Sequence, residues 1–469
     1  MRHDGSVAFS EDQIAKHRVD SVLSHLRSVV GAAHVLDDAS AMASYCHDWT
    51  RRYGGPAMCV VRPASLDELS DVVKVCSDAN MPMLPQGGNT GLVGGSVPSA
   101  DGPSPVLIST RRLSWMGDVD EASGQVSVGA GAVLGDVQRH VRAAGWEYGV
   151  DLAARDSATI GGTVATNAGG VRVLTFGMTR MQVAGIEAVL ADGAVISHMS
   201  GLAKDNTGLD LGQLLSGSEG TLAIITSVRL RLHRPFGPTS IALIGCSGYD
   251  DALDVTRTGV RGRLVAAEVL DETCMRLASE VGGLPNPLMG EHAIVLLLEV
   301  ADGGAGDGFV RSVVEERDAV VALDESERRR LWEYRERQGE FFDTRGIVHK
   351  LDVSVPLVRM EECVHELRSL ISTVETVQEF GIFGHIADGN IHVEIVGPEA
   401  DDADVDHAVL RCIARHGGAI SAEHGVGRAK VSDLTLSRSD EEISAMRAIK
   451  SAWDPRCLLN PGVLFDTTA

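Results

Sequence analysis

The sequence predicts an α+β protein with two or three domains. A chain of 469 residues is too long for one ordinary hydrophobic core. Strand-like segments at 58–63 and 81–88 flank a helical stretch at 65–80, which indicates a strand–helix–strand unit. The segment RPFG near residue 235 interrupts the pattern, and apolar strands separated by helices resume after it. A second α/β or α+β domain is therefore expected beyond this break.

Periodicity predicts the elements of the first half in chain order. Residues 12–45 are expected to be helical, and the helix at 65–80 begins with Ser65 and Glu68 in capping-box spacing. Another helix is expected at 132–144. The remaining strands are expected at 105–109, 125–129, 185–191, 194–198 and 222–233.

The second half alternates strands with helices and ends in a helical tail. Strands are expected at 241–247, 263–271, 293–301 and 349–356. Helices are expected at 325–342, 357–374, 404–416 and after residue 430, before the closing segment WDPRCLLNPGVLF.

Composition narrows the class of protein. The formal net charge of −23 argues against a nucleic-acid partner, because such binding depends on a basic surface. No apolar run reaches the ~18 residues of a membrane span. The eight cysteines occur singly, without a C-x-x-C pair, which indicates reduced, buried thiols. The first residues lack the apolar core of a signal peptide and carry acids, so we expect a cytoplasmic location, with peripheral membrane association as a variant. No feature specifies an oligomeric state.

Three glycine-rich segments lie in the first half of the chain, at 85–98, 158–170 and 217–226. Glycine lets a backbone approach a ligand closely, and consecutive N–H groups can bind an anion. None of the three contains the Gly-Lys-Ser/Thr of a nucleotide-binding P-loop. Three such loops close together favour a bound cofactor, and three tight structural turns are the alternative.

A further segment, GAGAVLG at 129–135, imitates the fingerprint of a dinucleotide-binding fold. It follows a predicted strand and precedes a predicted helix, and Asp151 lies 20 residues beyond Gly131. The spacing G-x-G-x-x-x-G is one residue too long for the fingerprint. An NAD site at this place is therefore the weaker alternative.

The segment GHIADGNIHVEI at 384–395 predicts a β-hairpin, because Asp388-Gly389 between apolar residues is a strong turn signal. A two-residue turn centred there places His385 directly opposite His392. Two facing imidazoles are either a simple stacked pair or the start of a metal site. A metal site needs a third ligand from elsewhere in the chain.

The segment SAEHGVG at 421–427 offers that third ligand. Glu423 and His424 are neighbours, and adjacent side chains in an extended chain point apart. One of the two could therefore bind a metal while the other contacts a substrate. A plain surface loop is the alternative for this segment taken alone.

Five motifs occur in an order that resembles flavoproteins of the vanillyl-alcohol-oxidase type: PQGGNTGLVGGSVP, IGGTVATNAGG, GSEGTLAIIT, GHIADGNIH and SAEHGVG. The resemblance is closest to the D-2-hydroxyglutarate dehydrogenase branch, beside D-lactate dehydrogenases and the FAD subunit of glycolate oxidase. It implies an FAD-binding domain of two subdomains at 53–235 and a substrate and metal cap domain with an antiparallel sheet at 236–430. A helical segment at 1–52 would precede them, and a helical tail at 431–469 would return to the flavin.

By resemblance, FAD is the cofactor, with its pyrophosphate against the first glycine-rich loop. That loop contains no histidine, the residue that anchors flavin covalently in some relatives, so non-covalent binding is expected. The residues expected to line FAD are Pro85, Gly87, Gly88, Asn89, Thr90, Gly91, Thr159, Gly162, Asn167, Gly169, Glu219, Gly220, Ile225 and Asn460.

By resemblance, His385, His392 and Glu423 bind a divalent metal, with zinc as the first expectation and manganese, cobalt or iron as alternatives. Two imidazoles and one carboxylate leave coordination positions open, as a catalytic site requires. The resemblance makes His424 the catalytic base and a substrate contact. An imidazole suits this task because its ordinary pKa is ~6.5.

The resemblance also implies the residues that bind substrate. The family positions matching Arg335 and Lys350 hold substrate carboxylates, and Asn390 matches a substrate contact. A charged, solvated helix end and a turn-capping asparagine are the plain alternatives. A substrate-binding threonine of the family is replaced here by Gly339, which leaves the exact diacid open.

The leading functional hypothesis is an FAD- and metal-dependent dehydrogenase that oxidises a D-2-hydroxy acid, with D-2-hydroxyglutarate first and D-lactate or D-malate as alternatives. No second cofactor motif is visible, so electrons would pass to an external acceptor such as a quinone, an electron-transfer flavoprotein or oxygen. Two other hypotheses are a metallohydrolase that uses the His-His-Glu set and a flavin-binding protein without catalysis.

Overall fold

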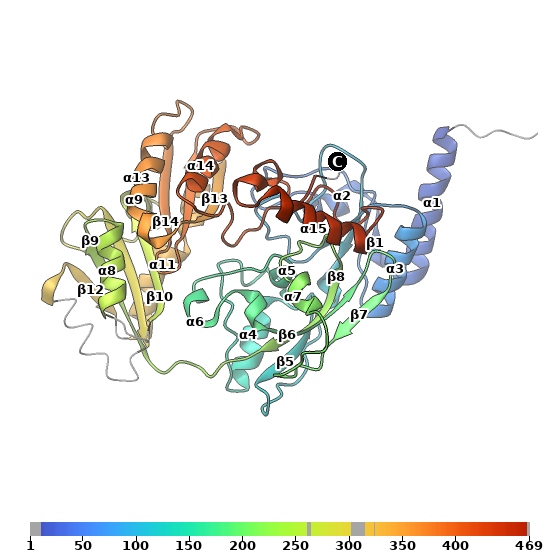
Figure 1. The fold of residues 1–469 in the computed structure, drawn as a ribbon, viewed down its shortest axis with the longest axis horizontal. Helices are drawn as coiled ribbons and strands as arrows, with labels where there is room; N and C mark the ends of the chain where they lie inside the picture. The colour runs from blue at the N-terminus through green and yellow to red at the C-terminus, as the bar shows by residue number, and fades with distance from the viewer. Residues whose placement is uncertain (1–10, 260–263, 302–314, 323, 467–469) are drawn as a thin grey trace, which may run out of the picture.

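The computed structural model describes residues 11–259, 264–301, 315–322 and 324–466. Helices and mostly antiparallel sheets are combined, so the predicted α+β class is confirmed. Figure 1 shows two lobes joined by the segment that follows residue 231. The first lobe contains two four-stranded sheets, and the second contains one seven-stranded sheet.

The first sheet has the order β1-β2-β4-β3, and the predicted strand–helix–strand unit forms part of it. Strands β2 and β3 both run parallel to β4, which lies between them. The hydroxyl of Ser65 caps the following helix by accepting the Glu68 N–H at 3.1 Å, as the spacing predicted. The elements are α1 (Glu11–Val30), β1 (Val35–Leu36), α2 (Ala39–Met42), β2 (Cys59–Val61), α3 (Leu66–Asp78), β3 (Met83–Gln86) and β4 (Val106–Ser109).

The single helical stretch predicted over 12–45 is wrong. Helix α1 ends at Val30 because Gly31 takes φ +84°, a left-handed conformation that terminates helices. Two short 3-10 turns, at 32–34 and 43–45, flank β1 and α2. Strand β1 pairs with β2 at the edge of the first sheet, so a tertiary partner overrides the local helical pattern.

The second sheet has the order β5-β8-β6-β7, and all of its pairs are antiparallel. The dinucleotide fingerprint requires a parallel strand–helix–strand unit, so the antiparallel partner of β5 excludes the NAD alternative at 129–135. The elements are β5 (Gln125–Gly129), α4 (Leu134–Ala143), α5 (Ile160–Ala165), α6 (Val173–Phe176), β6 (Val183–Val189), β7 (Val195–His198), α7 (Leu211–Leu215) and β8 (Ile224–Arg231).

The second lobe is built on an antiparallel sheet with the order β12-β9-β11-β10-β14-β15-β13. One face packs against α8, α13 and α14, and the other packs in part against α9, α11 and α12. The strands are β9 (Thr239–Cys246), β10 (Leu264–Asp271), β11 (Ile294–Ala301), β12 (Ala319–Ala322), β13 (Val348–Ser354), β14 (Glu379–His385) and β15 (Asn390–Val396). The helices are α8 (Tyr249–Gly259), α9 (Glu272–Glu280), α11 (Glu325–Glu336), α12 (Gln338–Asp343), α13 (Met360–Ile371) and α14 (Asp404–Arg415).

Two differences from the predicted elements occur in this lobe. The helix expected at 325–342 is divided at Arg337 into α11 and α12. The short edge strand β12 was not predicted, and it exists because it pairs with β9. Both differences depend on packing rather than on local sequence.

The tail leaves the second lobe and returns to the first. A 3-10 helix (Val431–Leu436) and α15 (Asp440–Trp453) lead to a segment that adds to the first sheet. There the Met83 N–H donates to Leu458 O at 2.7 Å, and the Asn460 N–H donates to Met83 O at 2.7 Å. The tail therefore ties residues 83–86 to the end of the chain.

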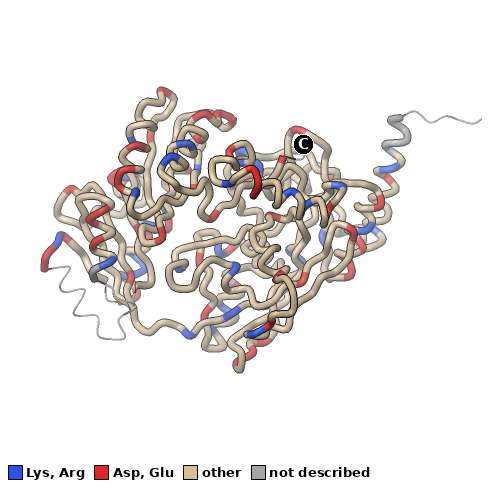
Figure 2. Tube along the Cα trace, viewed as in Figure 1, with Lys and Arg blue, Asp and Glu red and all other residues tan. Residues whose placement is uncertain are grey.

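The placement of charged residues and the character of the helices bear on what the composition predicts. Figure 2 shows Asp and Glu distributed over both lobes. Among the residues described by the structure, no helix has the length and apolar character needed to cross a membrane.

Candidate active site

One face of four neighbouring strands carries polar side chains. Strand register places Glu268 of β10 opposite His385 of β14, and His385 opposite Asn390 of β15. In the next rows His392 lies opposite Asp352 of β13, and Glu394 lies opposite Lys350. Because directly paired residues share a face and alternate residues return to it, all of these side chains gather on one surface.

The hairpin register differs from the prediction. The turn has four residues, 386–389, and it places His385 opposite Asn390 and His392 opposite Phe383. Ile386 leaves the hairpin because its N–H donates to Ala267 O of β10 at 3.0 Å. The observed pairing is shifted by two residues from the predicted one, and a shift by an even number leaves each side chain on the same face of the sheet. The two imidazoles are therefore diagonal neighbours, with ring centroids 5.5 Å apart.

Glu268 was missed by the sequence analysis, and it orients His385. Its two carboxylate oxygens bond His385 Nδ1 and Arg335 Nε, each at 2.6 Å, and its side chain is 1% exposed. Burial opposes charge on the imidazole, but the Glu268 carboxylate outweighs it and raises the pKa of His385 to about 9. A carboxylate on the far nitrogen is the usual support of a metal-binding histidine. The other nitrogen, Nε2, lies 3.4 Å from Arg335 Nη2 and 3.9 Å from Glu423 Oε1.

Glu423 meets these histidines from the loop 421–427. Its Oε1 lies 3.9 Å from His385 Nε2, and the potential ligand atoms of His385, His392 and Glu423 lie within 4.8 Å of one another. The first lobe contributes to this position, because the Gly170 N–H donates to Glu423 Oε1. A Cβ at Gly169 would lie 2.2 Å from the same oxygen. The three predicted metal ligands are thus brought together by both lobes.

Asp352 holds the loop in place, and it was also missed by the sequence analysis. Its Oδ2 accepts the backbone N–H groups of Ala422, Glu423 and His424, at 3.1, 2.7 and 2.9 Å. Burial opposes ionisation, but His424, His392 and Lys430 hold the pKa of Asp352 well below its usual range. A buried carboxylate with this many donors is a rigid anchor for the loop.

A second triad of possible metal ligands consists of Asp352, His392 and His424, also within 4.8 Å. Its carboxylate is already occupied, because Oδ2 accepts three backbone donors and Oδ1 accepts Asn390 Nδ2 at 2.8 Å. Among the described residues, the Glu423 carboxylate accepts one hydrogen bond, from the Gly170 N–H. The set His385, His392 and Glu423 is therefore the better metal site.

His424 lies beside this set and is suited to act as a base. Its ring stacks on His392 with centroids 5.9 Å apart, and its buried Nδ1 has no hydrogen-bond partner among the described residues. Burial lowers the pKa of His424 below its ordinary value, the Lys430 and Lys350 charges act in the same direction, and Asp352 opposes them. The imidazole is therefore neutral at pH 7 and able to accept a proton.

The two predicted substrate cations are both paired with carboxylates. Arg335 bonds Glu268, and its guanidinium lies 4.8 Å from the centre of the Phe383 ring. Lys350 Nζ lies 2.8 Å from Asp343 Oδ1 and 3.8 Å from Glu394 Oε2. Gly339 borders the same place, because a Cβ there would lie 3.4 Å from Lys350 Nζ. The missing threonine hydroxyl would thus have stood beside the Lys350 ammonium.

The glycine-rich loops of the first lobe lie against one another. A Cβ at Gly87 would lie 2.2 Å from Thr159 Oγ1, and one at Gly88 would lie 2.1 Å from Ser157 O. A Cβ at Gly220 would lie 2.5 Å from Pro85 Cγ. Side chains are therefore excluded where the first loop meets the other two, which is the close backbone approach expected of a cofactor cradle.

Strained backbone and unpaired polar atoms occur at the same loops and at Asn460 of the tail, whose Nδ2 donates to Gly95 O and Glu219 O. Asn89, Asn167, Glu219 and Asn460 all have positive φ, which costs ~1 kcal/mol or more for each such residue. Thr159 Oγ1 and Asn460 Oδ1 are buried without a hydrogen-bond partner among the described residues. Strain and unpaired atoms of this kind fit a site that binds a polar cofactor.

Several predicted flavin residues use their side chains to hold the protein together. Asn89 donates to Ser44 O and His47 O, and Asn167 Oδ1 accepts the Arg180 N–H. The Glu219 carboxylate accepts the N–H groups of Val426 and Gly427, each at 2.8 Å, which ties the third loop to the segment carrying Glu423. Ile225 lies in β8 with its side chain in the core. Thr90 and Gly91 lie in the first loop, whereas Gly162 lies in α5, inside the second glycine-rich segment.

We expect Asp352→Asn to lower turnover and metal affinity together by ~10- to 100-fold, the usual effect of losing a supporting group behind a metal site. The amide cannot serve both the three backbone donors and the donating Nδ2 of Asn390. Elemental analysis and steady-state kinetics at saturating metal would measure the two effects. Normal metal content with normal turnover would show that the loop does not depend on this carboxylate.

Comparisons with known proteins agree with this geometry. A family described as "FAD binding domain" matches residues 57–198, and one described as "FAD linked oxidases, C-terminal domain" matches residues 238–464. A mitochondrial D-2-hydroxyglutarate dehydrogenase of Bos taurus is 34% identical over 450 residues, which cover 93% of this chain and 82% of the relative. The chain belongs to the D-2-hydroxyglutarate dehydrogenase family of FAD-linked oxidases.

The family extends to other kingdoms and to a second named activity. A D-2-hydroxyglutarate dehydrogenase of Xanthomonas citri pv. viticola is 34% identical over 459 residues, covering 94% of this chain and 96% of the relative. A putative mitochondrial D-lactate dehydrogenase of Schizosaccharomyces pombe is 32% identical over 465 residues, covering 94% and 88%. This member of the family is therefore an FAD-linked oxidoreductase.

Solved structures show the fold of this family member. Substrate-bound p-cresol methylhydroxylase aligns with a TM-score of 0.77 at 15% identity, covering 97% of this chain and 98% of that one. The predicted vanillyl-alcohol-oxidase-type fold is confirmed.

The predicted cytoplasmic location is wrong in view of the relatives. Those from Bos taurus and Schizosaccharomyces pombe are named as mitochondrial, whereas the name of the bacterial relative carries no compartment. The prediction depended on the composition of the first residues. Targeting segments are short addresses separate from the folded core, so the motifs that identify this family carry no information on compartment.

Proposed function

We propose that the protein oxidises a D-2-hydroxy acid to the 2-oxo acid, with D-2-hydroxyglutarate as the first substrate and D-malate or D-lactate as alternatives. The observation that carries this proposal is the position of His424, a neutral base beside the His385, His392 and Glu423 cluster. The substrate is supported by the names of the relatives. A quinone or an electron-transfer flavoprotein is the proposed external electron acceptor.

In this proposal the residues of the sheet face divide the work. When bound, FAD supplies the acceptor for the hydride from Cα, and a divalent metal, zinc first, would supply a Lewis acid held by His385, His392 and Glu423. Arg335 binds the substrate carboxylate. Asn390 orients the substrate through its buried Oδ1, which has no hydrogen-bond partner in the described part of the chain. His424 accepts the hydroxyl proton, so that hydride loss and proton loss together yield the 2-oxo acid.

The colour of the purified protein tests this function. We expect a yellow chromophore that is released into the supernatant on acid precipitation, because no histidine lies in the first glycine-rich loop. Under anaerobic conditions D-2-hydroxyglutarate should bleach it and the L-enantiomer should not. A colourless protein would favour the metallohydrolase. A yellow protein that no D-2-hydroxy acid bleaches would favour a flavin-binding protein without this activity.

We expect Arg335→Ala to lower kcat/KM by roughly 10- to 150-fold while FAD stays bound. A buried charged hydrogen bond contributes ~1.5–3 kcal/mol, and Arg335 is 8% exposed. Arg337→Ala is a matched control, because this neighbouring arginine pairs at the surface with Glu340. Equal kcat/KM for both variants, for every hydroxy acid tested, would remove Arg335 from the substrate site.

We expect Glu394→Gln to favour diacids over monoacids. Lys350 lies beside two carboxylates, Asp343 and Glu394, so removing the Glu394 charge leaves only Asp343 of these two to compete with a distal substrate carboxylate for its ammonium. An interaction of ~1 kcal/mol would raise kcat/KM for D-2-hydroxyglutarate relative to D-lactate roughly fivefold. An unchanged ratio would place the distal group of the substrate away from Lys350.

A further inference from the structure

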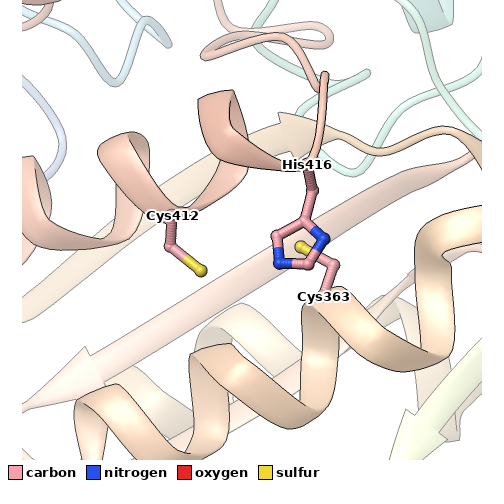
Figure 3. A group of neighbouring side chains, drawn as sticks. All are labelled: Cys363, Cys412 and His416. Carbon is pink, nitrogen blue, oxygen red and sulfur yellow. The ribbon is translucent and has the colours of Figure 1, made fainter.

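A third group of potential metal ligands lies between α13 and α14, on the opposite face of the sheet from the active site. Figure 3 shows Cys363, Cys412 and His416 pointing toward one another from these two helices. Their potential ligand atoms lie within 4.8 Å of one another. Among the described residues, it is the one such group that contains no residue of the active site.

We propose that Cys363, Cys412 and His416, with Glu366 as fourth ligand, form a structural site for a divalent metal of the zinc class. Two sulfurs, one imidazole nitrogen and one carboxylate oxygen make a closed four-coordinate set, which distinguishes a structural from a catalytic site. Thiolate ligands select zinc over magnesium or calcium.

Helical spacing explains why Cys363, Cys412 and His416 converge and why Glu366 lies beside His416. Cys363 and Glu366 are three residues apart on α13, and Cys412 and His416 are four residues apart at the end of α14, so each pair lies on one helix face. His416 still follows the helix, because its N–H donates to the carbonyls of Cys412 and Ile413. Helices α13 and α14 pack against the same core, so the face of α13 that carries Cys363 lies toward the face of α14 that carries Cys412.

Burial and charge fit a bound cation. Both cysteine side chains are fully buried and His416 is 5% exposed, whereas Glu366 reaches the surface and would close the site from outside. Glu366 Oε2 lies 2.7 Å from His416 Nε2, so these two groups are already adjacent. Two thiolates and one carboxylate would leave one excess negative charge around a divalent ion. Arg415, 2.5 Å from Glu366, and Arg359, 3.2 Å from His416 Nδ1, would offset it.

Two ordinary core cysteines are the plain alternative, and Cys246 shows how such a residue looks in this lobe. Cys246 is equally buried in the same core, but its sulfur approaches a backbone carbonyl, Ile244 O, at 3.8 Å. Cys363 and Cys412 instead face each other and an imidazole. Buried thiols grouped with a histidine and a carboxylate are the pattern of a metal site.

The site would support the loop that carries the catalytic residues. His416 is followed directly by the segment that leads to Glu423 and His424. That segment is tied to β13 by the reciprocal backbone bonds of Ser354 and Ala419, at 3.1 and 2.9 Å. A metal on His416 would fix the other end of this connection, and its role is structural rather than catalytic.

Cobalt substitution of the full-length holoenzyme tests the proposal, because the active-site set contains no sulfur. Protein produced in cobalt medium should show a thiolate-to-cobalt charge-transfer band in the near ultraviolet. Cys363→Ser, Cys412→Ser and His416→Gln should each weaken or abolish this band, lose a metal ion and lower the melting temperature. Cys246→Ser should keep the band. If a cysteine variant fails to fold, the band of His416→Gln decides.

Three results would overturn the proposal. The first is absence of the thiolate–cobalt band in folded protein that contains cobalt. The second is a band that persists unchanged in Cys363→Ser and Cys412→Ser. The third is a disulfide between Cys363 and Cys412, found by mass spectrometry of protein purified under argon. Because the band comes from sulfur ligands, it reports on this site whether or not the active site holds a metal.

Discussion

His424→Ala is expected to reduce flavin bleaching by D-2-hydroxyglutarate ~10²- to 10⁴-fold, the contribution of a general base, while metal and flavin contents stay normal. The imidazole lies beside the proposed metal ligands, and its Nδ1 has no partner among the described residues, so the side chain is free to take a proton. Stopped-flow reduction under anaerobic conditions, with elemental analysis of the same sample, measures both quantities.

The pH profile gives this experiment a second readout. Burial places the pKa of His424 below its ordinary value of 6.5, and a bound divalent cation would lower it further. Wild-type kcat/KM should therefore rise with pH through that pKa and reach its maximum by neutral pH. This rise on the acidic side should be absent in His424→Ala. His407→Ala is a suitable control, because that histidine pairs with Asp433 away from the site. Loss of metal in step with activity would make His424 a ligand rather than the base.

His385→Ala is expected to lose metal and activity together, with metal binding weakened at least ~100-fold, since loss of a mere supporting group already costs ~10–100-fold. This residue separates the two possible ligand triads. His385 belongs to the set with Glu423, His424 belongs to the set with Asp352, and His392 is common to both. Comparing His385→Ala with His424→Ala therefore identifies the set that binds the metal.

Protons should compete with the metal at His385. The Glu268 carboxylate raises the pKa of His385 to about 9, and a histidine must be deprotonated to act as a ligand. Wild-type metal affinity should therefore increase as pH rises toward that value. Retention of full metal by His385→Ala, with activity lost, would assign the metal to the other triad.

The sequence by itself determined the features that depend on local pattern. The glycine-rich loops, the hairpin signal and the Glu423-His424 pair are contiguous in the chain, so their residues identify the family without a structure. Most strands were predicted within two residues, because alternation of apolar side chains is a local property. The shared face of His385 and His392 was also predicted, since side chains alternate along any strand.

Only the tertiary structure decided which residues support that site. The turn has four residues because Ile386 bonds to a carbonyl of β10, a strand more than a hundred residues earlier in the chain. Glu268 and Asp352 lie in apolar strand patterns, and nothing near them in the sequence indicates that they hold His385 and the loop 421–427.

The same reason explains the surroundings of the proposed substrate-binding Lys350 and of the proposed cysteine site. Lys350 is paired with Asp343 and Glu394, which neighbour it only through strand register and the packing of α12. Cys363 and Cys412 are isolated in the sequence, and they meet because two helices pack on one core. Contacts between distant segments are created by folding, so a local pattern cannot carry them.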